Sequence, residues 1–208
     1  HLPARRWRGF RVWATDGTGF RLPDAPGLGE AFGWHGNQHD RVPSTRLLLS
    51  FDVLNEVAVS ARFHTRHISE SVVAQRYIER LSKDVLVVYD RGYASHIIPC
   101  LHLMHGTHCV IRMPVDKSLA VKAFVSSGKR QAIITERLGV KARLALRELG
   151  AAEVPLGATI TYRLVRVLLP TGEVEVLLTT LLDKMRYPHH LFGPLYSRRW
   201  GVETCIFT

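Results

Sequence analysis

Three carboxylates stand at positions where a folded chain could bring them together. Asp16 lies in the glycine-flanked stretch ATDGTG, and Asp90 directly follows the apolar run VLVVY. An acid at the carboxyl end of a buried strand lies at the edge of a sheet, where α/β proteins form their sites. Glu203 follows Arg199 by four residues and Tyr196 precedes that arginine by three, so on a helix these three side chains share a face.

Carboxylates that converge can hold divalent metal ions for chemistry on phosphates. Two such ions about 4 Å apart activate the attacking oxygen and stabilise the leaving one. Mg²⁺ prefers oxygen ligands and keeps several waters, so two or three carboxylates are enough. Taken singly, each acid has an ordinary interpretation, as a turn residue, a strand end or half of a surface ion pair. Spacing and composition leave their convergence open.

The composition describes a basic globular chain. It has 208 residues, 46% of them hydrophobic, and 28 Lys and Arg against 18 Asp and Glu, which gives a net charge of +10. This excess favours a polyanionic partner, with nucleic acid the first candidate. Three cysteines without a CxxC pair argue against a disulfide framework and a zinc ribbon, and fit a reducing cytoplasm. No apolar run reaches the roughly 18 residues of a membrane span, so no membrane partner is expected.

The first half of the chain alternates strand and helix patterns. RVWATDGTGFRL predicts two short strands joined through Gly17 and Gly19, and residues 23–44 read as a loop. STRLLLSFDVL and VAVSARFHT predict a hairpin that turns at Asn55 and Glu56. A helix is expected from 69 to 84, with Ser69 as its N-cap. VLVVY, which is apolar throughout, predicts a strand buried on both faces.

The following segments extend this alternation to residue 114. A helix is expected from Ala94, kinked at Pro99 inside it. HCVIRMP predicts another strand. The order of elements up to this point favours a mixed sheet with helices packed on it.

The character changes after Pro114. Residues 113–150 hold eight basic and three acidic side chains, and this segment is expected to contact the DNA backbone. VKARLALR favours a strand with a basic face, and a short helix remains an alternative. TITYRLVRVLLPTGEVEVLLTTLL predicts a hairpin turning at 170–172, and helix returns from about Pro188. The candidate DNA-binding residues here are Arg130, Lys141, Arg143 and Arg147.

Several of these motifs together resemble those of a known family. DGTGFRLPD, YDRGYAS, LLTTLLD and YSRRWGVE are similar to segments of DDE transposases, in the bacterial insertion-sequence family conventionally numbered four. The family's terminal signature is Tyr, two residues, Arg, three residues, Glu, and then Lys after six more residues. Tyr196, Arg199 and Glu203 match this spacing, and the Lys would fall just past Thr208. The resemblance runs from about residue 11 to the end, and indicates an enzyme truncated at both ends.

The resemblance implies a fold, a reaction and a set of residues. The fold is an α/β ribonuclease-H-like mixed sheet flanked by helices, with a β-rich insertion at 115–183 between the catalytic parts 11–114 and 184–208. The reaction is cut-and-paste transposition, in which a metal-activated water cuts the element end and the freed 3′-hydroxyl attacks a second phosphodiester. Asp16, Asp90 and Glu203 would hold two Mg²⁺ ions, for which Mn²⁺ could substitute. The complex with DNA could contain a homodimer of the protein.

Residues beside the acids would then contact DNA. Arg199 would hold a phosphate beside Glu203, since its planar fork matches phosphate geometry. Tyr196 would contact the backbone near the cut, and Arg91 is a further candidate. On a helix, Trp200 is expected to turn inward and anchor the segment to the sheet. A DNA-binding remnant without catalysis, or a structure-specific nuclease on the same fold, remains an alternative.

Overall fold

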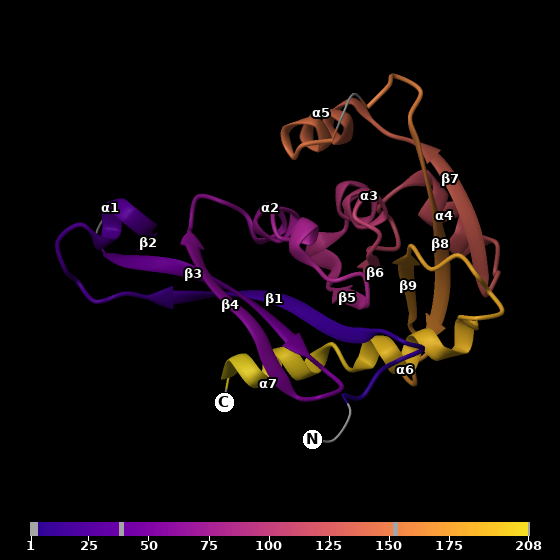
Figure 1. Ribbon diagram of the computed structural model, residues 1–208, viewed down its shortest axis with the longest axis horizontal. Helices are drawn as coiled ribbons and strands as arrows, with labels where there is room; N and C mark the ends of the chain where they lie inside the picture. Colours follow the sequence, from indigo (N-terminus) through magenta and orange to yellow (C-terminus); the bar gives the residue numbers. More distant parts are fainter. Residues whose placement is uncertain (1–3, 38–39, 152–153, 208) are drawn as a thin grey trace.

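The computed structural model describes residues 4–37, 40–151 and 154–207, and within them nine strands form a mixed sheet (Figure 1). The order across the sheet is β2-β3-β1-β5-β6-β9-β8-β7, and β4 pairs with β3. The parallel pairs are β1 with β5 and β5 with β6; the other pairs are antiparallel. The strands are β1 (Arg11–Arg21), β2 (Trp34–Gly36), β3 (Arg41–Asp52), β4 (Val57–Thr65), β5 (Val85–Tyr89), β6 (His108–Met113), β7 (Gln131–Arg137), β8 (Thr159–Leu168) and β9 (Val174–Thr179).

Helices cover both faces of this sheet, which makes the α/β ribonuclease-H-like expectation correct. One core cluster joins the α2, α3 and α5 side to the strands, and a second joins the strands to α6 and α7 on the other side (Figure 1). The helical segments are α1 (Leu28–Phe32), α2 (Glu70–Gln75), η1 (Ile78–Arg80), η2 (Arg91–Tyr93), α3 (Ile97–Met104), α4 (Leu119–Ser126), α5 (Val140–Glu148), η3 (His189–Leu191), α6 (Phe192–Ser197) and α7 (Trp200–Phe207). We call the two sides the α2 face and the α7 face.

Strand β1 differs from the sequence prediction because it is continuous. It runs through Gly17 and Gly19 without turning, and both glycines stay paired with β3. The segment 23–44, expected to be a loop, contains α1 and β2 and the start of β3. Beyond Ala14, β1 has no pairing with β5, so β1 and β3 continue together as an arm that extends away from the other strands (Figure 1).

The other expected strands are confirmed. Strands β3 and β4 form the hairpin whose turn contains Asn55 and Glu56, and β8 and β9 form the hairpin whose turn contains Gly172, which has the positive φ of 85° that favours glycine. All five residues of β5 are buried, as its unbroken apolar run predicts.

The local sequence patterns predicted the ends and the geometry of the helices less well than those of the strands. Helix α2 begins after Ser69, whose hydroxyl accepts a hydrogen bond from Val72 as predicted, but it ends at Gln75 because the backbone bonds shift to three-residue spacing. Helix α3 begins at Ile97, so Pro99 lies in its first turn, where an N–H has no partner within the helix and no kink is required.

The stretch VKARLALR forms helix α5, so the favoured strand is wrong and the helix alternative is right. Its alternating apolar residues fit a strand, but Leu146 alone of these side chains is buried. The segment 115–183 as a whole contains α4, β7, α5, β8 and β9, and β9 joins it to the sheet beside β6. Among the described residues, no helix is long and apolar enough to cross a membrane.

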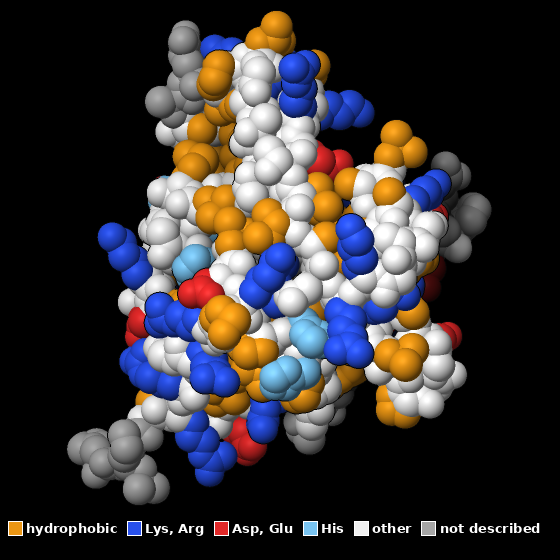
Figure 2. Space-filling view, turned by 90° about the vertical axis from the view of Figure 1, so that its right-hand side faces the viewer, with side chains coloured by type: hydrophobic (Ala, Val, Ile, Leu, Met, Phe, Trp, Pro, Cys, Tyr) orange, Lys and Arg blue, Asp and Glu red, His pale blue; other side chains and the backbone are white. Residues whose placement is uncertain are grey.

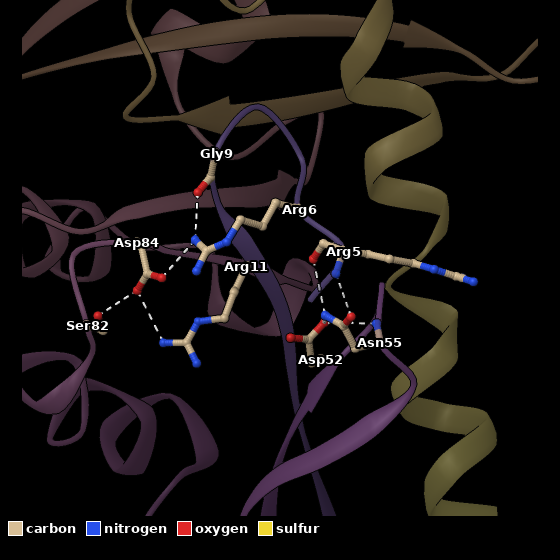
Figure 3. Close-up of polar contacts among 8 residues, drawn as sticks. All are labelled: Arg5, Arg6, Gly9, Arg11, Asp52, Asn55, Ser82 and Asp84. Atoms are coloured by element: carbon tan, nitrogen blue, oxygen red, sulfur yellow. Dashed lines mark hydrogen bonds and ion pairs between the residues drawn. The ribbon is translucent and has the colours of Figure 1, made fainter. Parts of the chain in front are cut away.

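The basic start of the chain is tied to two other parts of the fold (Figure 3). The backbone of Arg5 exchanges hydrogen bonds with Asn55 at the β3–β4 turn, at 2.8 and 3.2 Å. Arg6 and Arg11 both form ion pairs with Asp84, just before β5, at 2.8 and 3.2 Å. These contacts hold the pKa of Asp84 well below its ordinary value, first through the Ser82 hydroxyl and then through the two arginines. This N-terminal segment is therefore part of the fold.

Candidate active site

The sheet register brings the first two acids to the same level. In the parallel pair of β1 and β5, Arg11 lies opposite Val85 and Ala14 opposite Val88. The pairing ends there, and the proximity of the next acidic residues is shown by the charge of Asp90, which is among those that raise the pKa of Asp16. Because alternate residues of a strand face the same side, Asp16 shares its face with Val12 and Ala14, which belong to the core under α6 and α7.

Both acids have their local geometry fixed by the backbone. Asp16 accepts a hydrogen bond from the N–H of Gly17 at 2.8 Å. Asp90 has an extended backbone and caps η2 by accepting a bond from the N–H of Gly92, also at 2.8 Å. Each carboxylate keeps oxygen lone pairs free for a further ligand.

Arg199 joins the first acid to the third. Its Nη2 donates to Oε1 of Glu203 at 2.5 Å, and its Nη1 lies 3.9 Å from Oδ2 of Asp16. The side chain of Arg199 is only 5% exposed. Burial lowers the pKa of Arg199, but the hydrogen bond to Glu203 and the nearby negative charges outweigh it and raise that pKa overall. The guanidinium therefore stays charged between two carboxylates.

The electrostatics of Asp16 link all three acids. Burial is the main reason that the pKa of Asp16 is raised, and the charges of Asp90 and Glu203 raise it further. The Gly17 hydrogen bond and Arg199 oppose the shift without cancelling it. Three carboxylates thus lie close enough to feel one another, and their mutual repulsion is only partly neutralised by Arg199.

Tyr196 and Tyr93 border this group of acids. Tyr196 is 5% exposed, and burial raises the pKa of its hydroxyl; Arg199 and Asp90 are among the charges it feels. Burial likewise raises the pKa of Tyr93, followed by the charges of Glu70, Asp16 and Asp90. In the described part of the chain, neither hydroxyl finds a hydrogen-bond partner.

A fourth carboxylate, Glu70, touches the same strand from the α2 face. A Cβ on Gly17 would lie 2.4 Å from Cδ of Glu70, and a Cβ on Gly19 would lie 2.9 Å from Nη1 of Arg66. The glycines of the DGTG motif therefore leave space for two side chains that cross the strand. Sequence reasoning missed Glu70 and assigned the glycines to a turn; their alternate spacing on one strand face was the available signal.

The C-terminal arginines separate as expected, but the neighbouring tryptophan does not. Arg199 is buried and Arg198 is exposed. Trp200 is 56% exposed, so the expected inward anchor is wrong. Its ring stacks against the Arg199 guanidinium with 4.7 Å from Cζ to the ring centroid. A turn at 198–199 separates α6 from α7, and Leu195 and Val202 occupy the core-facing positions instead.

A groove of about 600 Å³ opens between the β8–β9 hairpin and α6, and none of the three acids lines it. Tyr196 and Trp200 line it, together with His189 and His190. Arg130 is exposed, and its charge reaches His189 at this end of the molecule. Arg91 is also exposed, and no ion pair or hydrogen bond joins its side chain to the acids within the described residues.

The predicted basic residues of α5 do not lie on one side. On a helix, Arg143 and Arg147 are four residues apart and share a face, whereas Lys141 is about 160° round from Arg143. Lys141 and Arg147 are exposed and Arg143 is half-buried. The three would share a face only on the strand that the sequence favoured.

Comparison with known proteins gives two findings. A family model described as "Transposase DDE domain" matches residues 7–206. The transposase InsG for insertion sequence element IS4, from Escherichia coli strain K12, is 28% identical over 203 residues. This alignment covers 97% of the present chain and 44% of that protein, so the chain spans less than half the length of this relative. Both findings agree with the resemblance drawn from the motifs.

Proposed function

Because the chain belongs to the transposase DDE domain family, we propose that it carries the centre for metal-dependent DNA cleavage and strand transfer of an insertion-sequence transposase. Asp16, Asp90 and Glu203 are the proposed catalytic and metal-holding acids. The observation that supports this most is the single arginine, Arg199, held between Asp16 and Glu203 while Asp90 lies beside Asp16.

The donor set fits Mg²⁺, and Mn²⁺ as a substitute. No group of three or more His, Cys, Asp or Glu side chains is arranged as a ready metal site in the ranges that the structure describes. The three acids nevertheless offer hard oxygen donors. Burial is the main cause of the raised pKa of Asp16, and the charges of Asp90 and Glu203 add to it, a repulsion that bound cations would relieve. When bound, two such ions would activate the attacking oxygen and stabilise the leaving one.

The protein's own side chains have distinct roles in this proposal. Asp16 and Asp90 hold their carboxylates in place through the Gly17 and Gly92 amides. Arg199 has two buried guanidinium nitrogens, Nε and Nη1, without a hydrogen-bond partner among the described residues, and a phosphate oxygen that entered the site would accept from them. Glu203 orients the third nitrogen.

Double-stranded DNA is the proposed partner on two surfaces. The groove beside Tyr196 would receive the backbone near the cut, and Trp200 would form its outer wall. Figure 2 shows Lys and Arg side chains spread over the end formed by β7, β8 and α4, with few acidic side chains among them. Arg130, Arg91 and the α5 residues Lys141, Arg143 and Arg147 would add phosphate contacts, which give affinity rather than sequence selectivity.

The catalytic parts would be residues 11–114 and 184–208, with 115–183 as the inserted segment. A homodimer on DNA would place one such site at each element end, because closed oligomers are commonly two-fold. Both statements extend the proposal and depend on the same three acids.

A cleavage assay tests the proposal. The substrate is a labelled duplex from the DNA flanking the coding sequence, incubated with Mg²⁺ or with EDTA. We expect Mg²⁺-dependent cleavage leaving a 3′-hydroxyl, lost in Asp90→Asn and retained in Asp116→Asn, which changes an exposed aspartate elsewhere. Equal cleavage by Asp90→Asn and the wild-type protein would refute the role of Asp90. Absence of cleavage by a folded, DNA-bound wild-type protein would favour a non-catalytic DNA-binding chain.

A further inference from the structure

A basic cluster on the α2 face lies outside every surface considered so far. Two arginines lie over the ring of Tyr77. The Cζ atom of Arg62 is 4.3 Å from the ring centroid, and the Cζ atom of Arg80 is 5.5 Å from it. The Tyr77 hydroxyl contacts Nε2 of His64 at 3.3 Å. Burial lowers the pKa of His64, and the charges of Arg62 and Arg76 lower it further, so both guanidinium groups lie near that ring. We call Arg62, His64, Arg76, Tyr77 and Arg80 the Tyr77 cluster.

The positive charges of this cluster are mostly uncompensated. Arg62 and Arg76 have exposed side chains, and neither forms an ion pair in the described part of the chain. Arg80 has a loose pair with Glu79 at 3.9 Å between two exposed side chains, a kind of contact that contributes little. Like charges held together repel, so an arrangement of this kind favours an anionic ligand.

Contacts within the protein hold the side chain of Arg62 in a defined orientation. Arg62 donates from Nε to the Ser60 hydroxyl at 3.2 Å while its plane rests on the Tyr77 ring. Nη1 and Nη2 of Arg62, the two nitrogens that bind a phosphate end-on, make no hydrogen bond in the described residues and remain available. An arginine stacked on an aromatic ring loses less side-chain entropy on binding than a free one.

The cluster is continuous with the strand that carries the first acid. Arg66 lies over Gly19 and Glu70 lies against Gly17, on the α2 face of β1. Glu70 forms an ion pair with Arg46 at 3.3 Å, which places a further guanidinium between the cluster and Gly17. Asp16, one residue before Gly17, faces the opposite side of the same strand. A duplex on the acids would therefore meet the cluster only with a segment away from the cut.

We propose that the Tyr77 cluster binds the phosphodiester backbone of duplex DNA outside the segment that is cut, an inference that rests on the proposed function. Its three arginines, on β4, at the end of α2 and in η1, supply contacts to phosphates without reading base edges. Their contribution is to hold the flanking duplex along the arm formed by β1, β3 and β4.

The test measures DNA affinity without catalysis. Fluorescence anisotropy of a labelled 30-bp duplex is followed in EDTA at several salt concentrations, for the wild-type protein and for Arg62→Ala/Arg76→Ala. The matched control is Lys83→Ala/Lys184→Ala, which also removes two exposed charges, neither of them part of the cluster. Log affinity decreases as log salt increases, and we expect this dependence to become shallower by about 2 in slope in the cluster variant. Each phosphate that the protein no longer neutralises accounts for roughly 0.9 of that change. The change in the control should be much smaller.

A third variant, Tyr77→Leu, removes the ring while keeping all the arginines of the cluster. Weaker binding in Tyr77→Leu with full binding in Tyr77→Phe supports the stacked arrangement. Affinity and slope equal to those of the charge-matched control would overturn the proposal, as would weaker binding to anionic vesicles with unchanged binding to DNA. Because binding is measured in EDTA, without divalent ions, it does not depend on cleavage. A failure of the cleavage assay and a failure of the cluster to bind DNA can therefore be told apart.

Discussion

The arginines on the two faces of the β1–β3 arm differ in burial and in whether they have acidic partners. On the α7 face, Arg199 is buried and lies between Asp16 and Glu203. On the α2 face, Arg62 and Arg76 are exposed and lack acidic partners in the described residues. A buried guanidinium must be neutralised by carboxylates within the fold, whereas an exposed guanidinium can stay unpaired in solvent and bind an anionic ligand. The contrast is the basis of the two proposals: an arginine that helps to hold the acids together on the α7 face, and arginines that bind DNA phosphates on the α2 face.

Removing the arginine from each face gives the largest expected difference. Arg199→Ala leaves two partly buried carboxylates without their shared cation, so we expect it to lower the free energy of unfolding by about 3 kcal/mol. Arg62→Ala and Arg198→Ala should stay within about 0.5 kcal/mol of the wild-type protein. Urea denaturation monitored by circular dichroism measures all three. Equal losses for Arg199→Ala and Arg62→Ala would remove the contrast.

The glycine between the faces gives the next largest effect. Gly17→Ala places a methyl group 2.4 Å from Cδ of Glu70, so we expect a loss of about 1–3 kcal/mol in unfolding free energy. Glu70→Ala should suppress most of this loss in the double variant, because it removes the clashing atoms. A double-mutant cycle by urea denaturation tests the coupling. Additive losses would show that the two residues do not meet across β1.

The protonation of Asp16 sharpens the description of the α7 face. Folding raises the pKa of Asp16 above its ordinary 3.8, so between those two values the folded chain binds more protons than the unfolded one. This group therefore lowers stability as pH rises through that window. Asp16→Asn should be more stable than the wild-type protein at pH 7, and the difference should shrink as pH falls through the raised pKa of folded Asp16 toward 3.8. Midpoints of urea denaturation across pH check the trend; a constant difference would contradict it.

The smallest expected effect concerns the exposed ring on the α7 face. Trp200 is 56% exposed and contributes mainly its stacking on Arg199, so Trp200→Ala should cost about 0.5–1 kcal/mol. Leu195→Ala, at a 2% exposed core position in the preceding helix, should cost about 2–5 kcal/mol. Thermal denaturation of both variants provides the comparison. A larger loss from Trp200→Ala than from Leu195→Ala would restore the inward anchor.

Local patterns predicted most strands because burial leaves a direct trace in composition. The unbroken apolar run of β5 and the turn at Gly172 identified their elements. The same reasoning failed at α5, where alternating apolar residues describe a strand but only Leu146 became buried. It failed again at Gly17, since the side chain that needs the space, Glu70, is 53 residues away and its approach is a tertiary event.

The candidate site was predictable by resemblance more than by physics. Spacing placed Arg199 and Glu203 on one helical face, and their hydrogen bond agrees. Whether Asp16 lies close to Asp90 depends on how β1 and β5 are aligned, which no local pattern fixes. Trp200 was misplaced because a turn at 198–199 interrupts the helix that the sequence suggested. The Tyr77 cluster joins β4 to α2 and η1, so its members give no common local signal.

Binding of Mn²⁺ tests the central statement, that three acids on the α7 face form one metal site. Electron paramagnetic resonance of free Mn²⁺ is measured during titration of the wild-type protein, of Asp16→Asn, Asp90→Asn and Glu203→Gln, and of Arg62→Ala/Arg76→Ala as the α2-face control. We predict saturable binding by the wild-type protein and the control, and strong weakening in each acid variant. Binding by all three acid variants at wild-type affinity would contradict the site.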